Sequence, residues 1–564
     1  MPNNSEKKLK LLDRLLAIGG AMAFLVLLAR YSLPSLSVPQ PILLAWAAVF
    51  PIGLFLEAFY RLIWVKNPWK YIAQHPLRFV ILLMILLELS GVATWSQSHK
   101  GGSATFSLIV GELYVTIAML AFIGSWIKGV LAANRWLANR SMPFLVLPTI
   151  TFSLVIFIGV IILSLPGFHR HPLAELDVLF TVTSAVCVTG LSVIDLPTSF
   201  TPQGQVIMAL LIQLGGLGTM TTLGMLALWH GGRLTLGERV MLKELVGGQQ
   251  LRQTKQLLKT IAFVTIVVEL LGTVALGFLW RNQMPHALLQ GAFHAISAFC
   301  NAGFSLFQDS FISLRQDRLT LLVIMTLVVT GGLGFAVVAD LYKSGVSRIL
   351  PWLEFKPLRK ATKVVLISTA GLILFGTLAF WLDGFHQHHP RTVFSALFQS
   401  ITCRTAGFQI ESQLHFGQFG FITALFLMAI GASPQSTGGG VRTTVFARLF
   451  YKIDPQDANQ TFKRLIFFKP FRIAFFCMAC YLGVAVAAAA LLLAFEPLTW
   501  QSALYETFSG LGTVGLSRDV TPTLSSAGKM CIIVLMFSGR VLFPTMVIRL
   551  IRSRRPSPDQ VEWV

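Results

Sequence analysis

Long apolar runs separated by short polar segments divide this chain into membrane-sized pieces. One membrane-spanning helix needs about 20 apolar residues. Four runs of this length precede residue 140, near 12–33, 41–64, 77–96 and 105–127. We interpret residues 1–140 as a group of about four extra N-terminal transmembrane helices.

From residue 141 onward the chain repeats a three-part unit four times. Each unit has a long apolar run, a shorter apolar segment that is too brief to cross a membrane, and a second long run. The first runs are expected at 143–165, 256–280, 362–382 and 471–495. The second runs are expected at 205–230, 318–342, 420–451 and 526–550. The unit boundaries follow as 141–230, 231–343, 344–453 and 454–564.

One short phrase with a central glycine ends the short segment of every unit. The phrases read Val188-Thr189-Gly190-Leu191-Ser192, Asn301-Ala302-Gly303-Phe304-Ser305, Thr405-Ala406-Gly407-Phe408-Gln409 and Thr513-Val514-Gly515-Leu516-Ser517. Successive central glycines lie 113, 104 and 108 residues apart. This regularity predicts an all-α polytopic membrane protein, in which four membrane helix–pore loop–membrane helix repeats surround a pseudo-fourfold pore.

Composition and charge support a membrane location and indicate an orientation. The chain is 54% hydrophobic and 12% charged, with a mean hydropathy of +0.70, whereas soluble domains carry about 25% charged residues. The net charge of +21 gathers in the segments 233–259, 343–363, 448–472 and 549–555. Basic loops stay in the cytoplasm, so we expect a cytoplasmic N-terminus, glycine phrases that face outward, contact with membrane lipid, and no nucleic-acid partner.

The glycine phrases have the chemistry of a cation filter. Backbone carbonyls can replace the hydration shell of a monovalent cation when several loops present them to one axis, and glycine tolerates the backbone angles this requires. The predicted filter comprises Val188, Thr189, Gly190, Asn301, Ala302, Gly303, Thr405, Ala406, Gly407, Thr513, Val514 and Gly515. Its ligand would be the permeant ion itself, and we expect no other metal site.

An acidic residue follows each filter glycine by four to six positions. These residues are Asp195, Asp309, Glu411 and Asp519. Together they are predicted to form an outer mouth that attracts cations. Solvated loop acids without a shared function are an equally good interpretation.

The second run of the third unit is interrupted where a gate would lie. Four glycines and a proline in 431–440 cannot sustain a helix, and this break lies on the cytoplasmic side of Gly407. The predicted gate residues are Gly431, Ser433, Pro434, Ser436, Thr437, Gly438, Gly439 and Gly440. Arg540, an isolated cation within the last run, is expected either to approach this loop and obstruct cations or to bind the loop's carbonyls.

These motifs resemble the Trk/Ktr/HKT superfamily of potassium transporters, in particular its KtrB-like membrane subunits. The four glycine phrases and the stretch from Ser433-Pro434 to Gly438-Gly439-Gly440-Val441-Arg442-Thr443-Thr444 carry the resemblance, which covers about 141–551. It implies potassium uptake across the bacterial inner membrane through a homodimer. It also implies a separate cytosolic nucleotide-binding RCK subunit, of the KtrA/TrkA type, with no nucleotide bound by this chain.

Two further points remain open at the level of sequence. Sodium is a possible second ion, and an alternating-access sodium- or proton-coupled cation transporter would use the intramembrane acids Glu57, Glu88, Glu112 and Glu269. Interhelical hydrogen bonding is the simpler use of these acids. A membrane enzyme would need a convergent catalytic set, which we do not find, so we predict that the chain is not an enzyme.

Overall fold

The repeating unit expected from the apolar runs is built from helices. The computed structural model describes residues 146–165, 167–218, 251–284, 286–349, 358–387, 391–434, 436–450 and 469–542. The chain divides into two compact units, and these residues all belong to the second, which comprises Ser141–Met225 and Leu236–Val564. The four predicted N-terminal spans lie outside the described residues.

The first two repeats share the order long helix, short helix, second helix. In the first repeat these are α6 (Val146–Leu163), α7 (Glu175–Cys187), the one-turn α8 (Leu196–Ser199) and α9 (Pro202–Gly216). In the second they are α12 (Leu251–Trp280), α13 (Ala287–Phe299), α14 (Arg318–Gly332) and α15 (Phe335–Ile349).

The last two repeats follow the same order. The third contains α16 (Lys360–His386), α17 (Val393–Thr402), the 3-10 turn η1 (Gln413–His415), α18 (Gln418–Ala429) and α19 (Thr443–Phe450). The fourth contains α21 (Lys469–Phe495), α22 (Trp500–Gly512), the 3-10 turn η3 (Thr521–Thr523), α23 (Ser526–Phe537) and the π-helical turn η4 (Ser538–Leu542). The described residues contain no strand beyond two isolated bridges, so the predicted all-helical class is confirmed.

Side-chain caps set where the short and second helices begin. The hydroxyls of Thr392 and Thr499 accept hydrogen bonds from backbone amides in the first turns of α17 and α22. Thr201, Asp317 and Ser525 do the same for α9, α14 and α23. Each cap satisfies an amide that has no partner within the helix. The caps therefore fix the residue at which each of these apolar helices begins.

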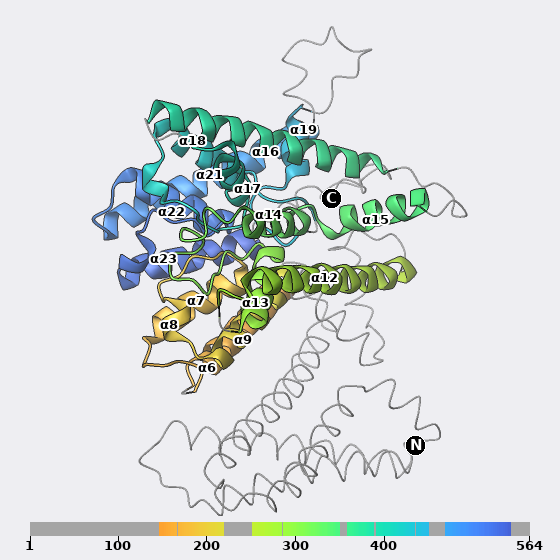
Figure 1. The fold of residues 1–564 in the computed structure, drawn as a ribbon. Helices are drawn as coiled ribbons and strands as arrows, with labels where there is room; N and C mark the ends of the chain where they lie inside the picture. Colours follow the sequence, from red (N-terminus) through yellow and green to blue (C-terminus); the bar gives the residue numbers. More distant parts are fainter. Residues whose placement is uncertain are drawn as a thin grey trace, which may run out of the picture. The chain divides into compact units, whose positions relative to one another are not determined.

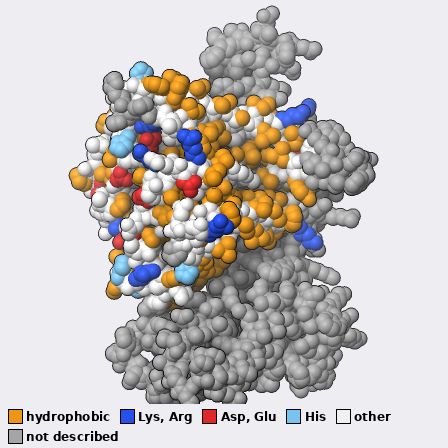
Figure 2. Space-filling model, viewed as in Figure 1, with side chains coloured by type: hydrophobic (Ala, Val, Ile, Leu, Met, Phe, Trp, Pro, Cys, Tyr) orange, Lys and Arg blue, Asp and Glu red, His pale blue; other side chains and the backbone are white. Residues whose placement is uncertain are grey.

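The long helices expose apolar side chains in the manner of a membrane protein. Leu258–Trp280, Lys360–His386 and Phe475–Phe495 are each long and apolar enough to cross a membrane. Figure 2 shows hydrophobic side chains over much of the visible face, with acidic side chains gathered toward one end. Ile367 on α16 is 72% exposed and Leu271 on α12 is 66% exposed. Apolar patches of this extent are rare on soluble monomers, and lipid accommodates them.

The repeats pack against one another in a closed order. Each short helix packs on the first helix of its own repeat and on the second helix of the preceding repeat, and α7, α13 and α22 also pack on the second helix of their own repeat. The inter-repeat pairs are α9 with α13, α14 with α17, α18 with α22, and α23 with α7. In Figure 1, α14 and α15 lie between the long helices α12 and α16. The short helices are thereby brought to the interior of the assembly, where their C-terminal ends meet.

The second run of the second repeat is not the straight span that the apolar pattern predicts over 318–342. α14 and the start of α15 meet at an angle of 103°. Gly334 has φ +88°, and an added side chain at Gly331 would collide with the carbonyl oxygen of Phe299. The helix ends there because the chain approaches the short helix closely and then turns. Gly215 and Gly539 make the matching approaches to the carbonyls of Val186 and Leu511.

Candidate functional site

The four filter glycines predicted from the repeats lie side by side around one centre. A Cβ added to Gly190 would lie 3.1 Å from the Cα of Gly303, and one added to Gly303 would lie 2.9 Å from that of Gly407. The same construction gives 3.1 Å from Gly407 to Gly515 and 3.1 Å from Gly515 back to Gly190. The glycines therefore form a closed ring, which we call the glycine ring, in the order of the repeats.

Carbonyl oxygens from the residue before each glycine complete this ring. The carbonyl of Ala406 would lie 2.8 Å from a Cβ on Gly303, and that of Val514 would lie 2.6 Å from a Cβ on Gly407. Thr189 and Ala302 approach Gly515 and Gly190 in the same way. Each glycine thus faces the carbonyl of the adjacent repeat. Any side chain at these four positions would displace one of the carbonyls.

The backbone of each hairpin is left-handed at two places, of which the sequence pointed to only one. The central glycines have φ values of +97°, +70°, +78° and +93°, as expected. Two residues earlier, Val188, Asn301, Thr405 and Thr513 also have positive φ, between 49° and 75°. β-Branched residues rarely adopt this conformation, and such strain tends to occur at functional sites.

Hydroxyl groups on the short helices hold the hairpins, and our sequence reasoning did not select them. Ser184 and Ser509, each six residues before a filter glycine, accept a hydrogen bond from the amide of Gly190 or Gly515 at 3.1 Å. Ser297 and Thr402 donate to the carbonyls of Phe304 and Phe408 at 2.7 Å. A small hydroxyl residue five or six positions before every glycine was the signal that could have found this set.

Two hairpin hydroxyls are buried without a protein partner. Within the described part of the chain, the side-chain oxygens of Thr189 and Thr513 are enclosed and make no hydrogen bond. Leaving a buried hydroxyl unsatisfied is costly. Both oxygens belong to the hairpins that form the glycine ring, where a dehydrated cation would be a suitable ligand.

Buried polar residues of the short helices support the segments that leave the ring. Glu506 on α22 accepts hydrogen bonds from the hydroxyl of Ser517 at 2.5 Å and from that of Thr521 at 2.7 Å. His294 on α13 occupies the matching position in the second repeat and pairs with Ser305 at 3.1 Å. Both residues are fully buried. The outer parts of these two hairpins are therefore fixed from behind.

The four predicted mouth acids do not have equal surroundings. Asp195 and Asp519 are exposed, and Asp309 is half-buried and accepts hydrogen bonds from Ser313. Glu411 instead forms an ion pair with Arg391 at 2.9 Å. Arg391 compensates part of this charge, which the other three acids retain in full.

Arg391 is the centre of a buried network that the sequence did not point to. It also pairs with Asp383 at 3.1 Å and donates to the carbonyl of His415 at 2.9 Å. Asp383 in turn accepts hydrogen bonds from the amides of Gly417 and Gly420. This network ties the end of α16 to the loop that follows the third hairpin.

The interrupted segment of the third repeat lies directly against the hairpins. α18 ends at Ala429 and α19 begins at Thr443, and we call the segment between them, residues 430–442, the third-repeat loop. Added side chains at Gly438 and Gly439 would collide with the hydroxyls of Thr405 and Thr513. Ser433 and Thr437 are fully buried. The loop fills the space beside the hairpins and leaves no room for larger residues.

Thr437 connects this loop to two other repeats. Its hydroxyl donates to the carbonyl of Phe299 at 3.2 Å, and its amide donates to that of Gly331 at 3.4 Å. Its own carbonyl accepts a hydrogen bond from Arg540. Arg540 also donates to the carbonyl of Gly215 at 2.6 Å. One arginine thus links the fourth repeat to the loop and to the first repeat.

Two further arginines stabilise the loop from within the third repeat. Arg442 donates to the carbonyls of Ser433 at 3.2 Å and Gly438 at 2.9 Å. Arg404 donates to the carbonyl of Gly431 at 3.3 Å. Guanidinium groups suit this purpose because they supply several fixed donors. The loop is consequently held in place by hydrogen bonds to its backbone.

Of the four intramembrane acids, only Glu269 lies within the described residues. It sits on α12 and forms a side-chain hydrogen bond with Gln213 of α9. Glu57, Glu88 and Glu112 lie outside them. In the described part of the chain no group of three His, Cys, Asp or Glu side chains is arranged to hold a metal ion.

Comparison with known proteins identifies relatives that match most of this chain. The family model TrkH, described as "Cation transport protein", matches residues 119–559. The Ktr system potassium uptake protein B of Vibrio alginolyticus is 34% identical over 431 residues, which cover 73% of this chain and 92% of that relative. The potassium/sodium uptake protein NtpJ of Enterococcus hirae is 31% identical over 421 residues, covering 71% and 91%.

A solved structure has a similar fold. It is the crystal structure of the potassium transporter TrkH from Vibrio parahaemolyticus, which aligns with a TM-score of 0.56 over 86% of this chain and 97% of its own. The sequence identity is 17%, so this likeness concerns the fold alone.

Proposed function

The chain belongs to the TrkH family of cation transport proteins, and on that premise we propose that it takes up potassium through the glycine ring. Its family consists of transport proteins, so the prediction that it is not an enzyme is confirmed. It is a multi-pass membrane protein. Relatives are named for potassium uptake, and one is named for potassium and sodium, which makes potassium the main expected ion and sodium a second candidate.

The observation that carries this proposal is the closed contact of four glycines with four carbonyls. A carbonyl set of this kind binds a cation without adding full charges, which allows the ion to enter and leave. The enclosed hydroxyls of Thr189 and Thr513 would add oxygen ligands. Asp195, Asp309 and Asp519 would concentrate cations at the outer end, and Glu411, which shares Arg391 with Asp383, would contribute less.

The third-repeat loop is the gate in this proposal. Its contacts with Thr405 and Thr513 put it next to the hairpins, and Arg540 would hold it closed through the carbonyl of Thr437. The positive charge of Arg540 would also repel a cation in this region. Opening would require the loop to leave these carbonyls, and water or an ion would replace the lost contacts.

Regulation is expected to come from outside this chain. We propose a homodimer that binds a separate cytosolic RCK subunit, which senses nucleotide and acts on the gate. Co-expression of a candidate RCK subunit tests this part. The two chains should purify together, and nucleotide should change potassium flux only when both are present.

Replacement of Gly190 with serine tests the proposed filter. The new side chain would collide with the carbonyl of Ala302 at a position with φ +97°. We expect the preference for potassium over sodium to fall about tenfold, equivalent to about 1.4 kcal/mol, in proteoliposome flux and in potassium-limited growth of an uptake-deficient bacterium. Gly483→Ser is the matched control, because a Cβ there meets nothing within 4 Å. Unchanged selectivity in folded Gly190→Ser protein would exclude this filter.

A further inference from the structure

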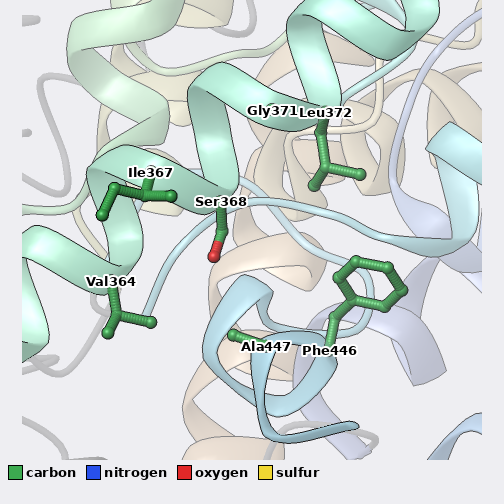
Figure 3. A pocket seen from close by; sticks show the side chains of 7 residues that line it. All are labelled: Val364, Ile367, Ser368, Gly371, Leu372, Phe446 and Ala447. Atoms are coloured by element: carbon green, nitrogen blue, oxygen red, sulfur yellow. The ribbon is translucent and has the colours of Figure 1, made fainter. Parts of the chain in front are cut away.

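An open apolar groove of about 320 Å³ separates α16 from α19. Val364, Ile367, Ser368 and Leu372 on α16 line it together with Phe446 and Ala447 on α19, and Figure 3 shows Ser368 and Leu372 pointing toward α19. Gly371 widens the groove at its middle, because an added Cβ there would meet nothing within 4 Å. The lining is apolar apart from the hydroxyl of Ser368. The groove is therefore suited to a hydrocarbon chain rather than to a polar solute.

The groove opens toward lipid. α16 is long and apolar enough to span the membrane, and Ile367 at the rim is 72% exposed, whereas Val364 and Leu372 on the inner wall are 7% and 6% exposed. A volume near the lower end of the usual range for ligand sites, about 300–1,000 Å³, accommodates part of one acyl chain but no headgroup. The headgroup must then lie beyond one end of the groove.

Two lysines occupy that end. Lys360 lies four residues before Val364, and Lys363 lies four residues before Ile367, so both share the groove's face of α16. Both are exposed, and neither forms an ion pair with another described residue. Their neighbour Arg359 is already engaged, since its Nε lies 3.7 Å from a carboxylate oxygen of Asp340. Two exposed lysines one helical turn before the residues that line an apolar groove complement a lipid phosphate next to its acyl chain.

We propose that this groove is a binding site for one anionic phospholipid, with its phosphate at Lys360 and Lys363 and one acyl chain between α16 and α19. The basic end of α16 belongs to the segment that the charge pattern assigns to the cytoplasm, so the lipid comes from the cytoplasmic leaflet. A zwitterionic lipid offers the same chain but no net negative charge, which makes the charge of the headgroup the discriminating feature.

The groove is also connected to the third-repeat loop through α19. We expect lipid binding to affect the gate, an inference that rests on the proposed function. α19 begins one residue after Arg442, which holds the loop carbonyls of Ser433 and Gly438. A bound acyl chain would fill the space between α16 and α19 and hold α19 in its present position. The closed loop should therefore be more stable when the lipid is bound, and basal flux should be lower.

Photo-crosslinking tests the binding site without reference to transport. The full chain is reconstituted in phosphatidylcholine vesicles containing phosphatidylglycerol with a photoreactive acyl chain, and adducts are mapped by peptide mass spectrometry. We expect adducts within 360–372 and 443–450 that unlabelled phosphatidylglycerol displaces and phosphatidylcholine does not. The double variant Lys360→Gln/Lys363→Gln should lower the preference for phosphatidylglycerol roughly 30-fold, because each lysine contributes about fivefold.

Matched variants separate this site from general lipid contact. Gly371→Leu should fill the groove and remove the adducts, whereas Gly483→Leu, at an equally open helix position on α21, should leave them unchanged. Lys259→Gln removes an exposed cation from α12 and should also leave them unchanged. Three results would each overturn the proposal. The adducts could persist in the groove variants, they could form equally with photoreactive phosphatidylcholine, or they could be absent because a second copy of the chain covers the groove. Intact crosslinking with unaltered flux would instead contradict only the link to the gate.

Discussion

At the scale of single residues, the hairpins combine strained backbone with specific support. Val188, Thr405 and Thr513 hold positive φ despite their branched side chains, at an expected cost of roughly 1–2 kcal/mol each. Hydrogen bonds that the glycine amides donate to the hydroxyls of Ser184 and Ser509 offset part of this cost. The strain persists because the surrounding short helices determine the path of the chain.

The serine on the fourth short helix offers a test of this support. Ser509→Ala would leave the buried amide of Gly515 without its partner, a loss of about 1–3 kcal/mol. We expect proteoliposome flux to show a weaker preference for potassium over sodium, with a modest decrease in Tm. Ser395→Ala, which removes a hydroxyl that donates to the carbonyl of Thr392 at the start of α17, serves as the control. A lower Tm with intact selectivity in Ser509→Ala would reduce Ser509 to a purely structural role.

The sequence revealed the residues whose identity the geometry restricts most strongly. Four glycines at similar spacings were recognisable because no other residue tolerates both positive φ and contact with a neighbouring carbonyl. The left-handed residues two positions earlier were not, since valine and threonine give no sign of that conformation. Arg391 was missed for another reason. Asp383 precedes it in the sequence and Glu411 follows it, and only the tertiary fold brings the three side chains together.

At the scale of elements, the short helices and the broken second helices determine the site. The apolar pattern predicts four units and an interruption of the third one, and in the structure α18 ends at Ala429 before α19 begins at Thr443. It did not reveal the bend of 103° between α14 and α15, because a bent pair of helices has the same continuous apolar composition as a straight span. The glycines near these bends allow the second helices to approach the short helices closely, and they also end the helices. Hydropathy does not distinguish these two roles.

Arg540 provides a test of the gate at this scale. It joins η4 to the third-repeat loop and to α9 through backbone carbonyls. Arg540→Gln would remove the charge and most of the donors, so we expect basal potassium flux without the regulatory subunit to rise severalfold. Arg540→Lys retains the charge and should give an intermediate value. Equal basal flux in wild-type and Arg540→Gln vesicles, at equal protein content, would remove Arg540 from the gating mechanism.

At the scale of the whole molecule, the central claim is that the four repeats together create one ion pathway. The closed order of contacts, from α9 with α13 to α23 with α7, brings the hairpins of distant segments to a common ring. Substituting any one glycine should therefore affect all four carbonyls, because each glycine contacts its neighbour in the next repeat. Family membership supports cation transport, and we propose the ring as its location.

Anomalous diffraction from crystals grown in rubidium, a heavier substitute for potassium, tests this claim most directly. We predict a rubidium peak on the axis of the glycine ring, within coordinating distance of the carbonyl oxygens of Thr189, Ala302, Ala406 and Val514. The peak should be weaker or absent in Gly190→Ser protein. Rubidium bound elsewhere in a transport-competent protein, with none at the ring, would contradict the account.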